Sequence, residues 1–162
     1  MDHQTYMRQA LEEARKAYAL GEVPIGAVVV LNGQITGRGH NLRETLKDSS
    51  AHAEILALRE AARALGDWRL NEATLYSTIE PCPMCAGAIV QFRLGTLVYG
   101  AADPKAGAVD SLLDLVRDPR FNHRVEVING VLEEECAGII RAFFRELRSG
   151  RLPLKAKEDT EE

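Results

Sequence analysis

The chain has 162 residues, 46% of them apolar and 27% charged, a composition typical of a globular protein with one core. Its longest apolar stretch, residues 25–31, is too short to cross a membrane. The first five residues lack the basic and apolar regions of a signal peptide, so a cytoplasmic protein is expected. Three cysteines, two of them in a C-x-x-C pair, cannot form a complete disulfide set and favour a reducing compartment. A net charge of −4 provides no overall attraction to nucleic acid.

Hydrophobic periodicity and turn residues predict ten helices and strands along the chain. Gly21 and Gly66 each follow a helical pattern as a stop signal, and Asn32-Gly33 is a strong hairpin signal. The expected elements are a helix over 4–20, strands over 25–31 and 34–41, a helix over 52–65, a strand over 73–79, a helix over 83–93, a strand over 96–100, a loop over 101–109, a short helix over 111–116, a strand over 125–128 and a helix over 133–148.

The order of these elements, α-β-β-α-β-α-β-α-β-α, predicts an α/β protein with one five-stranded mixed sheet and helices on both faces. This architecture is a three-layer α/β/α sandwich. Because no repeat or low-complexity linker divides the chain, residues 1–150 are expected to form a single domain. Residues 151–162 are polar, with four acids among the last five residues, and are expected to form a disordered tail.

Two short segments, His52-Ala53-Glu54 and Pro81-Cys82-Pro83-Met84-Cys85, indicate a catalytic zinc site. One imidazole and two thiolates provide three protein ligands and leave the fourth tetrahedral position open for water, unlike a structural zinc site. Both segments open a predicted helix, where the N–H groups and the helix dipole favour thiolates. Glu54 stands beside the ligands without being one, so we expect it to carry protons between the zinc-bound water and the substrate. The pair of segments matches the signature of zinc-dependent nucleobase deaminases.

A C-x-x-C pair alone also occurs in redox proteins and in structural zinc sites. A structural site needs a fourth Cys or His, but Cys136 lies on the apolar stripe of the last predicted helix. The remaining histidines, His3, His40 and His123, are isolated in the sequence. A redox function would not explain the His52-Ala53-Glu54 segment. The catalytic site is therefore favoured, with zinc expected rather than iron for this set of ligands.

From near Met7 to Arg148 the chain resembles the bacterial tRNA-specific adenosine deaminases of the cytidine deaminase-like superfamily. Three segments recur in several nucleobase deaminases, and three later ones point toward the tRNA enzymes. They are residues 22–28 (EVPIGAV), 51–55 (AHAEI) and 80–88 (EPCPMCAGA), followed by 100–113, 122–125 and 143–145. The resemblance implies a cytidine deaminase-like fold and hydrolysis of adenosine to inosine at the wobble position of a tRNA anticodon. It also implies attack of the zinc-bound water on C6 and a homodimer with one Zn²⁺ per subunit.

The same resemblance implies functions for individual residues. By position, His52, Cys82 and Cys85 would be the zinc ligands, and Glu54 the proton shuttle. Asn41 falls where the family hydrogen-bonds the flipped base. Contacts to the anticodon stem-loop, which both subunits would provide, fall at Asp103, Lys105, Asn122, Phe144 and Arg148, with Arg43 as a further candidate.

The last predicted helix carries an aromatic residue that the core does not require. Phe144 lies off the apolar stripe, and Arg141 and Arg148 share its face of the helix. An aromatic ring between arginines suits stacking on an unpaired base, whereas a ring in the core or in a dimer interface is the alternative. The helix predicted over 83–93 is apolar nearly all round, which fits either core burial or a dimer interface.

Two other functions remain open. A deaminase of free guanine or cytosine compounds would keep the zinc segments but would not need an aromatic residue flanked by arginines. A zinc-stabilised RNA-binding module would need neither Glu54 nor an open metal position. Six Lys and Arg residues between 141 and 157 accompany a single acid, Glu146, which indicates either a local basic patch or an ordinary solvated face.

Overall fold

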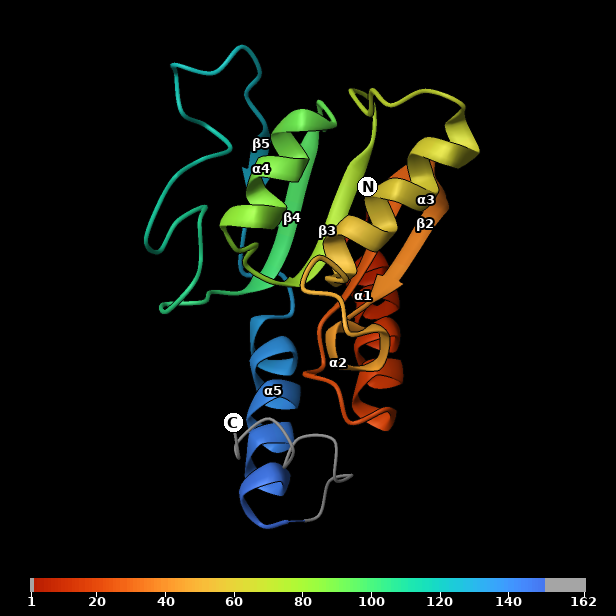
Figure 1. The fold of residues 1–162 in the computed structure, drawn as a ribbon. Helices are drawn as coiled ribbons and strands as arrows, with labels where there is room; N and C mark the ends of the chain where they lie inside the picture. Colours follow the sequence, from red (N-terminus) through yellow and green to blue (C-terminus); the bar gives the residue numbers. More distant parts are fainter. Residues whose placement is uncertain (1, 151–162) are drawn as a thin grey trace.

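The computed structural model describes residues 2–150 and contains one five-stranded sheet in the order β2-β1-β3-β4-β5 (Figure 1). β1 runs antiparallel to both of its neighbours, whereas β3, β4 and β5 run parallel. The strands are β1 (Gly26–Leu31), β2 (Gln34–His40), β3 (Thr74–Ile79), β4 (Thr96–Ala101) and β5 (Glu126–Ile128). The helices are α1 (His3–Ala19), α2 (Arg43–Leu46), α3 (Ala53–Leu65), α4 (Pro83–Gln91) and α5 (Glu133–Arg148).

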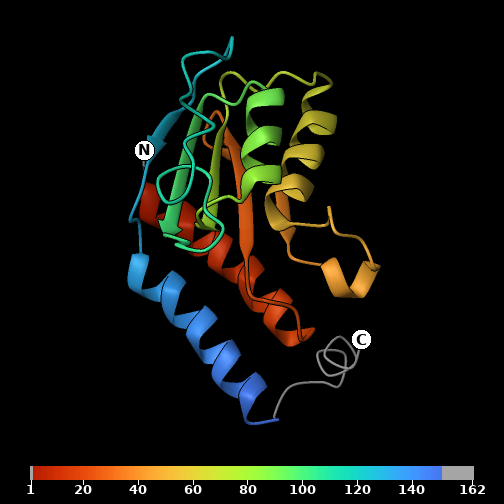
Figure 2. The ribbon, with the colours of Figure 1, turned by 60° about the vertical axis from the view of Figure 1, so that its left-hand side comes forward.

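Helices cover both faces of the sheet (Figure 2). α3 and α4 pack over one apolar core, and α1 and α5 pack over a second core on the opposite face. The predicted three-layer α/β/α sandwich with a mixed sheet is therefore confirmed. Two glycines of β2 let α3 approach closely, since a Cβ on Gly37 or Gly39 would lie 2.1 or 2.2 Å from the carbonyl oxygen of Ala57 or Ala53. The start of α3 is thus held directly against the sheet.

Four strand ends meet at one end of the sheet. β2, β3 and β4 finish there, and β1, which runs antiparallel to β2 and β3, begins there. The chain segments that enter or leave at this end carry Ile25, Asn41, Cys82 and Asp103. Active sites in α/β folds commonly lie beyond the carboxyl ends of parallel strands, so this end is the place to look for one.

Two local features differ from the sequence-based expectation. The short helix predicted over 111–116 is wrong, because this segment forms turns and the N–H of Ser111 donates to the carboxylate of Glu80. The four-residue α2 was not predicted. Its N–H groups at Glu44 and Thr45 donate to the buried carboxylate of Glu22, which lies more than twenty residues earlier. In both places a distant carboxylate determines the local backbone.

The Asn32-Gly33 hairpin is confirmed. Both residues have positive φ, 52° and 75°, as a two-residue type I′ turn requires. The predicted tail, residues 151–162, lies outside the described residues. Between residues 2 and 150, no helix combines the length and the apolar character needed to span a membrane.

Candidate active site

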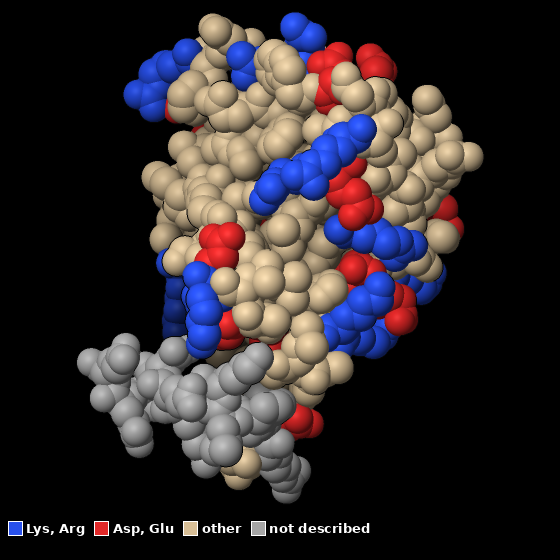
Figure 3. Space-filling view, turned by 45° about the vertical axis from the view of Figure 1, so that its right-hand side comes forward, with Lys and Arg blue, Asp and Glu red and all other residues tan. Residues whose placement is uncertain are grey.

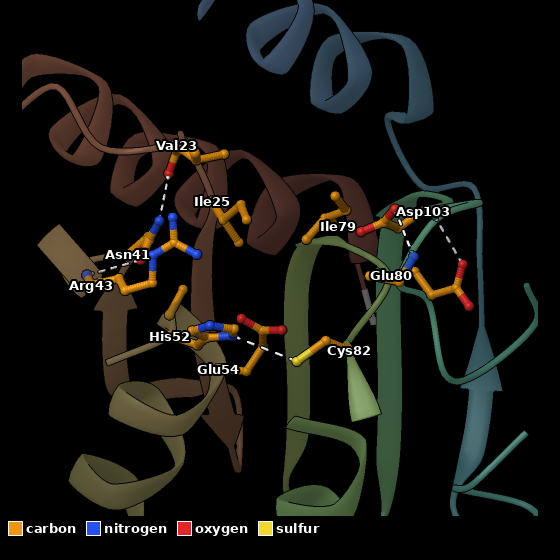
Figure 4. A pocket seen from close by; sticks show the side chains of 12 residues that line it. Val23, Ile25, Asn41, Arg43, His52, Glu54, Ile79, Glu80, Cys82 and Asp103 are labelled. Carbon is orange, nitrogen blue, oxygen red and sulfur yellow. Dashed lines mark hydrogen bonds between the residues drawn. The ribbon is translucent and has the colours of Figure 1, made fainter. Parts of the chain in front are cut away.

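Three side chains able to bind a metal meet where two helices begin, and Figure 4 shows two of them, His52 and Cys82. His52 immediately precedes α3, Cys82 immediately precedes α4, and Cys85 lies in the first turn of α4. The Sγ atoms of Cys82 and Cys85 lie 3.6 and 3.4 Å from Nδ1 of His52. All three donor atoms lie within 4.8 Å of one another, so the expected grouping of these residues is observed.

This spacing fits a single tetrahedral ion. Zinc–sulfur bonds of about 2.3 Å and zinc–nitrogen bonds of about 2.0 Å, at the tetrahedral angle, place two such ligand atoms about 3.5 Å apart. Within residues 2–150 the cluster contains no fourth His, Cys or carboxylate. Cys136 is buried in the core on the α1 and α5 face, as its place on the apolar stripe predicted. The geometry is that of a three-ligand site.

In the absence of a cation, the pKa values of the three side chains in the cluster are shifted in different directions. Hydrogen bonds from the Cys85 thiol and from His52 lower the pKa of Cys82 to about 4 in spite of its burial. The hydrogen bond to Cys82, together with burial, raises the pKa of the Cys85 thiol. The same sulfur raises the pKa of His52 through its hydrogen bond to the imidazole. A bound cation would take the place of these protons, since metal ligation requires thiolates and a neutral imidazole.

Glu54 lies in the first turn of α3, between His52 and Cys82 (Figure 4). Its side chain lines the pocket, yet the residue is only 3% exposed, and burial raises the pKa of its carboxyl. The carboxylate is not part of the three-ligand cluster. A carboxyl group with a raised pKa, close to a metal but not bound to it, is suited to both accepting and donating a proton.

Polar residues lie on both sides of the pocket over the cluster (Figure 4). Asn41 and Arg43 lie on one side and Asp103 on the other, beside Glu80, whose carboxylate points away from the pocket into the loop after β4. Asn41 is 7% exposed and is held by its neighbours: its Nδ2 donates to the carbonyl of Val23 at 3.3 Å, and its Oδ1 accepts from the N–H of Arg43 at 3.1 Å. The remaining lining residues are Val23, Ile25, Ala53, Ile79 and Ala106.

Asp103 lines the pocket, and its side chain also organises its own turn. Its Oδ1 accepts hydrogen bonds from the N–H groups of Lys105 and Ala106 at 3.1 and 3.2 Å. The lone pairs not used by the turn are available to a hydroxyl or a base edge in the pocket.

A second hollow runs along α5. Phe144 is 39% exposed there, while the neighbouring Phe143 is buried and meets its ring edge-on. Phe144 therefore lies off the apolar stripe, as predicted. The hollow brings together the ring and four cationic side chains, its lining being Lys105, Ile140, Arg141, Phe144, Arg145 and Arg148. Asn122 is exposed on the loop before β5 and lines neither this hollow nor the pocket.

The face drawn in Figure 3 carries basic side chains that lie beside acidic ones, with much uncharged surface around them. It has no broad basic area. The α5 hollow, with its four cationic side chains, is a candidate for contact with a polyanion, since a chain with a net charge of −4 needs a local basic site for such a contact.

Comparison with known proteins agrees with this geometry. The profile of the MafB19-like deaminase family matches residues 1–148. A tRNA-specific adenosine deaminase of Bacillus subtilis is 60% identical over 143 residues, which cover 88% of this chain and 89% of that protein. The chain belongs to this family of deaminases. The tRNA-specific adenosine deaminase of Haemophilus influenzae is 48% identical over 151 residues, 93% of this chain and 87% of that one.

Solved structures show the same fold. A structure from work on A-to-I editing by tRNA:A34 deaminases superposes with a TM-score of 0.80 and is 48% identical, covering 83% of this chain and 98% of that one. A guanine deaminase from Nitrosomonas europaea has a TM-score of 0.75, covering 86% of this chain and 83% of that one. At 24% identity the latter shows a shared architecture only.

Sequence patterns gave no function to one residue that lines the pocket of this deaminase. Glu80 is 1% exposed and accepts hydrogen bonds from a loop more than twenty residues away. The only local sign is an acid between Ile79 and Pro81, directly after a buried strand. An acid in such a position must find buried donors or lose its charge.

Proposed function

We propose that this enzyme hydrolyses adenosine to inosine at the wobble position of a tRNA anticodon, with one Zn²⁺ held by His52, Cys82 and Cys85. The observation that carries the proposal is a buried, unligated Glu54 beside a three-ligand cluster at the base of a pocket. The relatives at 48–60% identity are tRNA-specific adenosine deaminases, which supports tRNA as the proposed substrate. The proposed catalytic domain is residues 1–150, and the proposed location is the cytoplasm, where tRNA is found.

Glu54 is the proposed proton shuttle of the reaction. Zinc, when bound, supplies a Lewis acid that brings the pKa of water toward about 7. Hydrolytic deamination at C6 moves two protons: one from the attacking water to the ring nitrogen, and one from the hydroxyl formed on C6 to the departing amine. Glu54 is placed to accept and then deliver each in turn, because its carboxyl faces the pocket between His52 and Cys82.

Asn41 is the proposed contact to the flipped base. Its amide already makes one hydrogen bond as a donor and one as an acceptor, to Val23 and Arg43. One N–H and one lone pair remain for the substrate. Because both existing bonds fix the orientation of the amide, the free donor and acceptor are presented to the pocket without a loss of side-chain freedom on binding.

The proposed anticodon contacts fall into two groups. Lys105, Phe144 and Arg148 line the α5 hollow, where phosphates and an unpaired base would bind. Asp103 would accept from a hydroxyl or base edge at the pocket, and Asn122 would contact RNA from the exposed loop before β5. Because cationic side chains that neutralise phosphates release counterions, binding should weaken with added salt.

A homodimer is proposed, with α4 in its interface. Met84 at the start of α4 is 38% exposed, and Leu112 and Leu113 on the loop after β4 are 60% and 49% exposed. Large apolar side chains exposed in this way are typical of surfaces that become buried on association. Sedimentation of the zinc-loaded protein would show a mass of two chains if this is correct.

The direct test of the proposed reaction is an inosine assay. The zinc-loaded protein should convert a wobble adenosine in an anticodon stem-loop to inosine, and a stem-loop with guanosine at that position provides the control. Free guanine, cytidine and adenosine should remain unchanged under the same conditions. Turnover of a free base or nucleoside, without turnover of the stem-loop, would contradict the proposed substrate.

Replacing Phe144 with alanine should weaken binding of the stem-loop while the protein stays folded, because the ring is exposed. Loss of one base–aromatic stack is worth about 1–3 kcal/mol, which is about 5- to 150-fold in Kd. Trp68→Ala removes an exposed ring that lines neither hollow and should leave Kd unchanged. Unfolding of the Phe144 variant, seen by circular dichroism, would instead assign the ring to the core.

A further inference from the structure

The loop between β4 and β5 forms one wall of the pocket, although it has no helix or strand of its own. Residues 103 and 109–111 of this loop donate hydrogen bonds to the carboxylate of Glu80, and Figure 4 shows Asp103 beside it. Oε1 of Glu80 accepts from the N–H of Asp103 at 3.0 Å and from the hydroxyl of Ser111 at 2.5 Å. Oε2 accepts from the N–H groups of Val109, Asp110 and Ser111 at 3.1, 2.8 and 2.9 Å.

Five donors from one loop therefore converge on two oxygen atoms that are almost fully buried. Among residues 2–150 no Lys or Arg forms an ion pair with Glu80, so the loop itself satisfies the carboxylate. The fit is close at Gly107, where an added Cβ would lie 2.3 Å from the carboxyl carbon of Glu80. Only a group that accepts at both atoms matches this set of donors, and a glutamine would present an NH₂ group to some of them.

Glu80 also joins this loop to the metal-ligand segment. It lies two residues before Cys82, at the end of β3, and its own N–H donates to the carbonyl of Ala101 at 2.8 Å. The N–H of Ala108 donates to the carbonyl of Pro81, also at 2.8 Å. The backbone that presents Cys82 is thus the same backbone that holds the loop with Asp103 and Lys105.

We propose that Glu80 is a positioning residue for substrate recognition: its carboxylate holds the 103–111 loop in a fixed position relative to Cys82. Asp103 and Lys105 are thereby held at a fixed place relative to the reacting centre. The inference rests on the proposed function, because these two residues are proposed anticodon contacts. Glu80 does not touch the substrate's reacting atoms, so its loss should affect recognition more than the chemical step.

The test compares Glu80→Gln with Glu13→Gln in the zinc-loaded protein. Glu13 is a matched control, because it is a buried carboxylate of α1, 3% exposed, that pairs with Lys16 and His40 away from the loop. In Glu80→Gln, hydrogen exchange at the N–H groups of residues 103 and 109–111 should accelerate by about tenfold or more, with exchange in α3 and β3 unchanged. KM for the stem-loop should rise by about tenfold, with a much smaller change in kcat.

Glu13→Gln should leave the exchange of the loop and KM as in the wild type, whatever its effect on melting temperature. If Glu80→Gln fails to fold, Ser111→Ala removes only one of the five donors and should produce the same loop-specific acceleration, reduced in size. Unchanged loop exchange, equal acceleration across the whole sheet, or a loosened loop with unchanged KM would each overturn the proposal. If the wild type does not convert the stem-loop, the proposed function fails, and the exchange comparison still decides whether Glu80 holds the loop.

Discussion

Replacing Glu54 with glutamine should abolish most turnover while the protein keeps its metal and its affinity for RNA. Glutamine has the size of glutamate but cannot accept and return a proton, so kcat for a stem-loop should fall by about 10²- to 10⁴-fold. The metal should stay, because the carboxylate is not part of the His52, Cys82 and Cys85 cluster. Single-turnover rates, metal content by mass spectrometry and stem-loop Kd together separate the chemical step from binding.

Glu60 provides the control for this substitution. It lies on the same helix, α3, but is exposed and outside the pocket, so Glu60→Gln should leave kcat unchanged. A Glu54→Gln enzyme with near-normal kcat would mean that another group moves the protons. A variant that lost its metal would instead show that Glu54 supports the ligands, and the loss of rate would then say nothing about proton transfer.

The metal cluster could be predicted from the sequence because its geometry is mostly local. Two residues between Cys82 and Cys85 place both sulfurs at one helix start, and Pro83 favours that start. His52 begins the other helix. The strand order, which brings the two starts together, was not predicted, since the pattern of alternating helices and strands and the family resemblance indicated only a five-stranded mixed sheet with helices on both faces.

The loop around Glu80 and the short α2 could not be predicted, because their hydrogen bonds cross long stretches of sequence. Ser111 is bonded to Glu80, and Thr45 to Glu22, in each case across more than twenty residues. Periodicity reports which face of a segment is buried, but it does not report which distant carboxylate will accept its N–H groups. For this reason the helix predicted over residues 111–116 is wrong, and the segment forms turns instead.

The metal itself should contribute to stability, and Cys85→Ser should reveal by how much. Cys85 is fully buried with its sulfur 3.4 Å from His52, so a serine there removes a ligand with little change in size. We expect the metal-to-protein ratio to fall from one toward zero and turnover to disappear. An ion present at about 1,000 times its Kd stabilises the folded state by about 4 kcal/mol, so the wild type should melt at a clearly lower temperature after chelation.

The control is Cys136→Ser, which changes a thiol buried in the opposite core. That variant should keep one metal per chain and should still respond to a chelator, even if its melting temperature is lower. Cys85→Ser should melt at the same temperature with and without the chelator, because no ion remains to be removed. If the Cys85 variant still holds one metal, the ion has another ligand. The site would then lack the free coordination position on which the proposed hydrolysis depends.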